Sequence, residues 1–219
     1  MIDSLPTLSL LETRVLGTLV EKQRTVPDTY PLSVNALVAG CNQKTSRNPV
    51  IEVGEAEVLL AIDRLRELDL VAEISGSRVA RYGHRLERVL GVPSQSSALL
   101  TVLMLRGPQT AGELRLNCER LHKFADISSV EAFLAELAAR PAAPLVVELP
   151  RLPGSRENRW IHLLSGQPAI EAMAARVSGA MPASQELDEL KARLAALEAE
   201  VAELREMFQQ RSVGASSQA

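Results

Sequence analysis

The sequence predicts a mainly α-helical fold with small β-hairpins, in the α+β class, and three observations lead to this prediction. Hydrophobic residues make up 46% of the chain but aromatic residues only 3%, so Leu, Val, Ile and Ala must build the core. Such residues suit helices packed on one another or on small sheets. Apolar residues recur at helical spacings in most segments. Two pairs of short β-type runs flank turns that contain Gly, which predicts two hairpins.

The first two predicted helices have clear starting signals. A capping box of Ser9 and Glu12 begins a helix that we expect from about Leu10 to Lys22. Ser33 is expected to cap a second helix after an interruption by two prolines. The apolar face of this second helix consists of Val34, Leu37, Val38 and Cys41.

A polar loop, "CNQKTSRNPVIEV" at residues 41–53, separates the second helix from a third. Within this loop, Val50, Ile51 and Val53 are expected to form a very short strand. The segment "EAEVLLAIDRLREL" after Gly54 predicts the third helix, and "LVAEI" and "RVARY" around "SGS" predict a hairpin. Helix, helix, helix, hairpin is the order of elements in a winged-helix domain.

The same order recurs in the second part of the chain. An apolar helix is expected over residues 98–106. Two capping boxes, Thr110 with Glu113 and Ser128 with Glu131, are expected to begin the next two helices. The runs "PLVVEL" and "NRWIHLL" then predict a second hairpin. The sequence therefore predicts two tandem winged-helix domains.

We expect the first winged-helix domain to span residues 1–92 and the second to span 93–168. A linker containing Gly, Pro and Ser is predicted at 169–183, a coiled-coil helix at 184–211, and a disordered tail at 212–219. The a and d positions of the coiled coil, which form the predicted oligomerisation interface, are Leu187, Leu190, Leu194, Leu197, Val201 and Leu204, followed by Phe208.

Charges beside the predicted coiled-coil seam indicate how it pairs. In a parallel dimer each g residue meets the e residue five positions later on the partner helix. These pairs are all opposite in sign: Glu186 with Lys191, Arg193 with Glu198, and Glu200 with Arg205. The pattern favours a parallel homodimer, and the alternative is an amphipathic helix that docks its leucine face within its own chain.

The charge of the chain limits the classes of partner. The formal net charge at pH 7 is −3. Seven acids and four bases follow residue 183, so this segment carries 4 − 7 = −3 and the rest of the chain is formally neutral. A globally basic nucleic-acid binder is therefore disfavoured, and any basic patch must be local.

No targeting segment is apparent, and no apolar run approaches the ~18 residues that a membrane span requires, so we expect a soluble, cytoplasmic protein without membrane contact. Cys41 and Cys118 lie far apart in the sequence, which fits a reducing compartment. Both occupy apolar-periodic positions and are expected to be small buried hydrophobes.

Three stretches of the first unit carry a resemblance to a known family. They are "LETRVLGTLVEK", "TVPDTYPLSVNALVAGCNQKTSRNPV" and "EAEV". The chain closely resembles the YceH-like family of bacterial proteins, densely over residues 10–91 and less densely through the second unit to the tail. The resemblance implies tandem winged helices, in agreement with the element order above. The function of that family is unknown, so the resemblance implies no activity.

The polar loop and the first hairpin supply the candidate nucleic-acid contacts. The loop offers cations and amides that could meet phosphates and base edges, and the alternative is a solvated connection. The hairpin places five potential cations within eleven residues, and the alternative is that these side chains pair with nearby acids. The predicted nucleic-acid-binding residues are Gln43, Lys44, Thr45, Ser46, Arg47, Arg78, Arg81 and Arg85.

The predicted third helix does not fit the usual DNA-reading role. In a DNA-binding winged helix this element enters the major groove and should present Arg, Lys, Asn or Gln. Between residues 55 and 69 there are two bases and five acids, so the segment carries 2 − 5 = −3. Acidic groups repel phosphates, and docking through this helix is disfavoured.

An enzyme is not predicted. His84, His122 and His162 lie in different elements without metal-ligand spacing, and neither a GxSxG motif nor a Gly-rich phosphate loop is present. We therefore expect no catalytic residues, metal or cofactor. The first hypothesis is a DNA-binding or transcription-regulator-like protein that contacts double-stranded DNA through the polar loop and first hairpin. The alternative is a protein–protein adaptor whose acidic third helices face a basic partner.

Overall fold

Two sets of elements follow one another in the same order in the computed structural model, which describes residues 7–74, 79–141, 143–151 and 155–167. The first set is α1 (Leu10–Thr25), η1 (Pro27–Thr29), α2 (Val34–Cys41), α3 (Glu55–Glu67), β1 (Val71–Ile74) and β2 (Arg81–His84). After α4 (Leu86–Leu90), the second set is α5 (Ser94–Arg106), α6 (Ala111–Asn117), α7 (Ile127–Ala138), β3 (Val146–Glu148) and β4 (Trp160–His162). The predicted combination of helices with small antiparallel sheets is confirmed.

Each set closes on a two-stranded antiparallel hairpin, to which the loop before its second helix adds one residue. Leu32 exchanges two backbone hydrogen bonds with Tyr82, at 2.8 and 3.1 Å, and Gln109 does the same with Trp160, at 2.7 and 3.1 Å. Leu32 and Gln109 each directly precede the residue that caps the next helix. The hairpin registers place Val71 opposite His84 and Val146 opposite His162.

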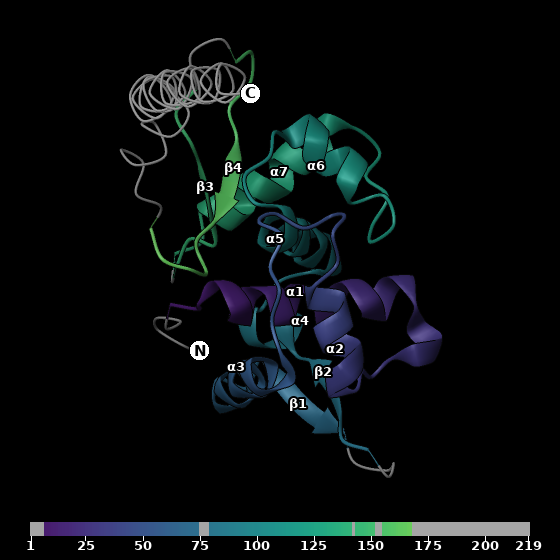
Figure 1. The fold of residues 1–219 in the computed structure, drawn as a ribbon. Coiled ribbons are helices and arrows are strands. Elements are labelled where there is room, and N and C mark those ends of the chain that lie inside the picture. Colours follow the sequence, from purple (N-terminus) through teal and green to yellow (C-terminus); the bar gives the residue numbers. More distant parts are fainter. Residues whose placement is uncertain (1–6, 75–78, 142, 152–154, 168–219) are drawn as a thin grey trace, which may run out of the picture. The chain divides into compact units, whose positions relative to one another are not determined.

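The first helices of the two sets, α1 and α5, pack against each other in the middle of the unit (Figure 1). Eight consecutive residues of α1 and ten of α5 are buried, so these helices are enclosed on all sides rather than amphipathic. Gly17 allows the close approach, because a Cβ added there would lie 3.0 Å from the side chain of Leu105. In Figure 1, α2, α3 and the first hairpin lie below this pair, and α6, α7 and the second hairpin lie above it.

A single hydrophobic core runs through both sets. Buried side chains from α1, α2 and α3 join those from α5, α6 and α7 in one cluster, and residues up to 168 form one compact unit. The expected boundary at residues 92 and 93 does not divide this core. Cys41 and Cys118 are both buried and free, as their apolar-periodic positions predict.

Two local predictions were wrong, and both for hydrogen-bonding reasons. Residues 50–53 form no strand, because the side chain of Asn42 binds both the N–H and the C=O of Val53, at 3.0 and 2.9 Å. The cap of α7 is Asp126 rather than Ser128, and its carboxylate accepts the N–H of Ser129 at 2.7 Å. A carboxylate at that position also suits the positive end of the helix dipole.

Candidate functional site

The polar loop between α2 and α3 is held by hydrogen bonds at both of its ends and at residues 46–49. Beyond the Asn42 pairing, the backbone N–H of Asn48 donates to the carbonyl of Leu105 in α5, at 2.8 Å. The hydroxyl of Ser46 accepts a hydrogen bond from Arg106, also at 2.8 Å. The loop, for which the sequence allows either a solvated connection or a binding element, is therefore packed against the second set of elements.

Two buried arginines anchor this loop: Arg14, which lies in α1, and Arg47, which belongs to the loop itself. Arg14 is fully buried and donates to the backbone carbonyls of Cys41 and Pro49, at 3.1 and 2.6 Å. Arg47 has a side chain that is 0% exposed, and it donates to both carboxylate oxygens of Glu21, at 3.1 and 2.6 Å. Burial, followed by the nearby charge of Arg47, lowers the pKa of Arg14.

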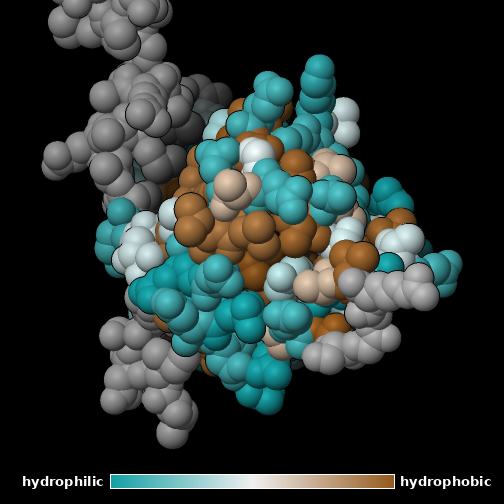
Figure 2. All heavy atoms as spheres, turned by 60° about the horizontal axis from the view of Figure 1, so that its bottom comes forward, coloured by the Kyte–Doolittle hydropathy of each residue, from teal (hydrophilic) through white to brown (hydrophobic). Residues whose placement is uncertain are grey.

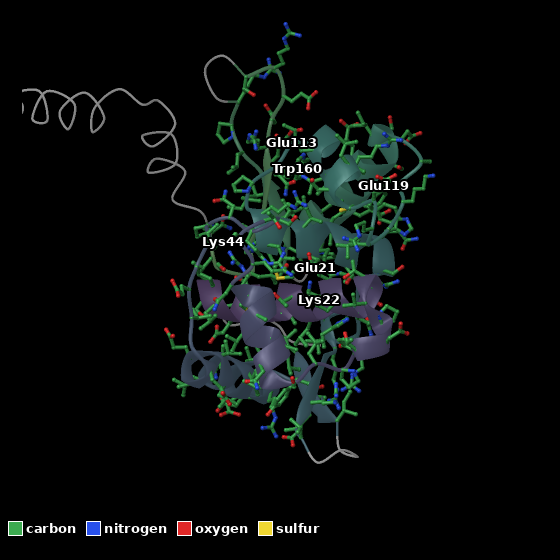
Figure 3. All side chains as sticks on the ribbon, turned by 45° about the vertical axis from the view of Figure 1, so that its right-hand side comes forward. Glu21, Lys22, Lys44, Glu113, Glu119 and Trp160 are labelled. Atoms are coloured by element: carbon green, nitrogen blue, oxygen red, sulfur yellow. The ribbon has the colours of Figure 1, made fainter. Side chains whose placement is uncertain are left out.

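Arg47 is one of the predicted DNA contacts, but its side chain is buried in the pair with Glu21. Burial alone would raise the pKa of Glu21, but the hydrogen bonds and charge of Arg47 lower it below the usual value, so the carboxyl is ionised. Figure 3 shows Glu21 on the side of α1 that faces α5. Arg47 therefore neutralises an internal acid and does not face a phosphate backbone in this structure.

The other predicted loop residues differ in their exposure. Lys44 and Thr45 are exposed, Gln43 and Ser46 are partly buried, and Lys44 lies at the edge of the unit in Figure 3. The loop thus presents one cation at its tip on a backbone that is held firmly.

The cations of the first hairpin are tied to neighbouring groups. Arg81 donates to the backbone carbonyls of Thr29 and Pro31, at 3.3 and 2.8 Å. Arg85 and Arg88 both pair with Asp69. The structure thus brings Arg81 and Arg85 into contacts that attach the hairpin to the rest of the first set. Arg78, which also belongs to the predicted basic cluster, lies outside the described residues.

Two histidines in the second strands of the hairpins are partly buried and neutral at pH 7. Nε2 of His84 lies 2.7 Å from Oε1 of Gln23, and burial lowers the pKa of His84 to about 4. Burial also lowers the pKa of His162 to about 4. Within the described residues, no three His, Cys, Asp or Glu side chains are placed to hold a metal ion. None of the described helices is long and apolar enough to cross a membrane.

The outward face of α2 and α3 combines apolar and acidic side chains. Leu60, in the middle of α3, is 72% exposed, and Ala56 one turn earlier is also exposed. Figure 2, which looks onto the lower end of Figure 1, shows an apolar area in the centre of this face with hydrophilic residues around it. Four acids of α3 are exposed: Glu55, Glu57, Asp63 and Glu67.

The two arginines of α3 are engaged with these acids. Arg64 pairs with Glu67 at 2.7 Å, and Arg66 pairs with Asp63 at 3.4 Å. Helix α2 contains no charged residue, and its outward side presents small apolar groups such as Ala36 and Ala39. The outward face of α2 and α3 thus has no unpaired cation to meet the phosphates of a DNA duplex. It consists of an apolar centre with an acidic border.

The corresponding helix of the second set has a similar character. The exposed residues of α7 include no base, and they are Ile127, Ser128, Glu131, Ala132, Ala135 and Glu136. In the second hairpin, Arg159 donates to the carbonyl of Pro108 at 2.8 Å and pairs with Glu113 at 3.0 Å. The linker, the coiled-coil helix and the tail predicted at 169–219, with the oligomerisation residues from Leu187 to Leu204, lie outside the described residues.

Comparison with known sequences places the chain in a family. Residues 8–155 match the family described as "Protein of unknown function, DUF480". The chain belongs to this family. A UPF0502 protein of Dechloromonas aromatica (strain RCB) is 72% identical over 214 residues, which cover 97% of this chain and 99% of that protein. A UPF0502 protein of Burkholderia pseudomallei (strain 668) is 62% identical, with 92% of this chain and 86% of that protein covered.

A third member, from Methylibium petroleiphilum, is 61% identical over 202 residues, with 90% of this chain and 85% of that protein covered. The resemblance to an uncharacterised bacterial family is thus confirmed, over nearly the full length of these relatives. The description of the DUF480 family names no activity, so membership in it assigns no function to this chain.

Proposed function

We propose that the protein is a non-enzymatic docking protein built from two winged-helix units, and that the outward face of α2 and α3 binds a partner protein. The winged-helix assignment rests on the order of three helices and a hairpin, repeated in both sets. It is also supported by the bridge that Leu32 and Gln109 each make to the second strand of their hairpin. In such a unit α3 occupies the position of the helix that reads DNA.

The observation that carries the proposal is the surface chemistry of α3. Its exposed large hydrophobic side chain is Leu60, and the exposed charges around it are acids, with both arginines paired to them. A phosphate backbone would be repelled by this surface. A basic segment with an apolar anchor fits it, because opposite charges orient the encounter and a large apolar contact supplies affinity.

A photocrosslinking amino acid at position 60 tests this proposal directly. The full-length chain carries it in place of Leu60 in the native host, and the lysate is treated with nuclease before analysis. We expect one discrete crosslinked protein, and purified partner should bind Leu60→Asp at least about tenfold more weakly. The substitution should change folding stability by no more than about 0.5 kcal/mol, since the side chain is exposed.

The matched control places the same crosslinker at Leu116, which is 69% exposed on α6. Charge reversal at Glu57 and Glu67 should weaken partner binding as well, and lower salt should strengthen the wild-type complex. Identical crosslinks at positions 60 and 116, or none at position 60, would rule out the α3 surface as the docking site.

DNA binding remains the second candidate function, favoured by the exposed Lys44 at the tip of a firmly held loop. It predicts duplex binding that weakens steeply with salt. Lys44→Ala should reduce the slope of log K against log salt by about 0.9 if this residue meets one phosphate. If Lys44→Ala binds duplex DNA as the wild type does, or if the wild type binds no duplex at low salt, DNA binding through this loop is excluded and the docking proposal remains.

We also propose homodimerisation through the C-terminal segment, with Leu187, Leu194 and Val201 at a positions. The three g–e pairs of opposite sign support a parallel arrangement. Exposed pairs of this kind contribute only about 0.2–1 kcal/mol each, so the dimer should be weak. Sedimentation of the full chain against a chain ending at Ala183 tests this: equal concentration dependence in both would exclude the segment as the dimer interface.

A further inference from the structure

The polar loop forms one wall of a recess of about 240 Å³ at the junction of the two sets of elements. The last turns of α1 and α5 and the end of α6 form the remaining walls. Thr45 and Ser46 line it with hydroxyls, and Asn117 lines it with an amide that also donates to Oε1 of Gln109, at 2.5 Å. A second recess of about 330 Å³ adjoins it and shares Ser46, Arg106 and Asn117.

The cations of the first recess are only partly compensated. Its one acid, Glu21, is already bound by both guanidinium nitrogens of Arg47, at 2.6 and 3.1 Å. Lys22 lies farther from that carboxylate, at 3.6 Å, and Arg106 bonds only the neutral hydroxyl of Ser46. Arg120 is exposed at the rim.

The charge balance favours an anion. After the Glu21–Arg47 pair is set aside, Lys22, Arg106 and Arg120 contribute a formal +3. Three helices end at the recess, and each C-terminus supplies a partial charge of about −0.5. The three cations contribute +3 and the three helix C-termini together about −1.5, so the recess carries a net positive charge of roughly +1.5. The second recess adds no net charge of its own, because its Arg159 pairs with Glu113.

We propose that this recess binds a small phosphate-bearing molecule. Guanidinium groups match phosphate oxygens in paired hydrogen bonds, and hydroxyl and amide donors complete the contacts to a tetrahedral anion. The volume is below the roughly 300 Å³ at which sites for drug-sized ligands begin, so the ligand is a short phosphorylated compound rather than a dinucleotide. A ligand in this position contacts α1, the loop, α5 and α6 together, and it thus links the two sets of elements.

Inorganic pyrophosphate is the probe for the test, added to the full-length chain and followed by calorimetry and thermal unfolding. The variant Lys22→Gln with Arg120→Gln removes two of the three cations; Arg120 is exposed, and Lys22 lies 3.6 Å from Glu21. The control Lys123→Gln with Arg151→Gln removes two exposed cations away from the recess. We expect pyrophosphate to raise the Tm of the wild type and the control, and to bind the variant at least about tenfold more weakly.

Three results would overturn the proposal. They are no binding to the wild type at about 10 mM pyrophosphate, equal weakening in the control, and a short DNA duplex that competes with pyrophosphate and loses affinity in the same variant. The last result would assign the recess to a nucleic-acid backbone instead. Should the double variant have a lowered Tm without ligand, Arg120→Glu alone repeats the comparison at an exposed position.

Discussion

At the scale of single residues, the most consequential group is the buried pair of Arg47 and Glu21. The sequence shows an arginine in a polar loop, and nothing in the loop distinguishes it from Lys44 three residues earlier. The difference arises because Glu21, 26 positions away on α1, lies inside the unit and requires a cation. Local composition cannot show a pairing between residues so far apart in the sequence. For this reason Arg47 was predicted at the surface, whereas the structure buries it.

The first prediction concerns this pair. Arg47→Ala should destabilise the protein by about 2–3 kcal/mol, because it leaves the largely buried carboxylate of Glu21 with only Lys22, at 3.6 Å, as a cationic neighbour. Lys44→Ala, which removes an exposed cation from the same loop, should change the free energy of unfolding by less than about 0.5 kcal/mol. Urea denaturation of both variants measures the difference. Comparable effects in the two variants would contradict the burial of Arg47.

The second prediction concerns pH. Burial lowers the pKa of His162 from 6.5 to about 4, so between these values the unfolded chain binds a proton that the folded chain does not. Its contribution to stability is therefore complete above pH 6.5 and is lost as the pH falls toward 4. His84 adds the same dependence, and ionised Glu21, with its lowered pKa, adds a loss at still lower pH.

The measurement is urea denaturation at pH 7.5 and pH 5. Because Gln does not titrate in this range, His162→Gln should lose about 2 kcal/mol less than the wild type between the two pH values. An identical loss in the variant and the wild type would mean that His162 is not held neutral by burial.

At the scale of elements, the helices were predictable wherever a local signal fixed them. Ser9, Ser33 and Thr110 each cap the helix that the sequence assigns to them. The start of α7 was misplaced, because Asp126 and Ser128 both precede the same apolar run and either can act as a cap. The short strand at 50–53 failed because the hydrogen-bond partner of Val53 is a side chain, that of Asn42.

The third prediction separates the two candidate caps of α7. Asp126→Ala should cost about 1 kcal/mol, because the N–H of Ser129 loses its acceptor and the helix dipole loses a favourable charge. Ser128→Ala should change stability by less than about 0.5 kcal/mol, since it is an exposed residue inside the first turn. Thermal or chemical denaturation of the two variants gives the comparison, and a larger loss in Ser128→Ala would restore the cap expected from the sequence.

At the scale of the whole molecule, the repeat was visible in the sequence but its packing was not. Capping boxes and hairpin runs recur along the chain, and they indicated two units. Whether two such units share a core depends on the contact between α1 and α5, which lie far apart in the sequence. The only local sign is that residues 98–106 are apolar nearly all round, a pattern that indicates burial on every side rather than on one face.

The fourth prediction follows from that shared core: a fragment of residues 1–92 should not fold by itself. Without α5, side chains of α1 that are now fully buried, such as Leu16 and Leu19, lose part of their cover. Exposing a large apolar side chain costs about 1.5–3 kcal/mol, so roughly four of them cost as much as the 5–15 kcal/mol by which a whole domain is stable.

The matched control for this experiment is a fragment of residues 1–168, which keeps both sets of elements. We expect it to unfold in one cooperative transition, with circular dichroism and tryptophan fluorescence changing together, although Trp160 reports only on the second hairpin. Gly17→Val should lower the midpoint of that single transition for both probes, because the added side chain meets Leu105 at the crossing of α1 and α5. A cooperative transition in the 1–92 fragment, or separate midpoints for the two probes in the longer one, would show that each unit folds independently of the other.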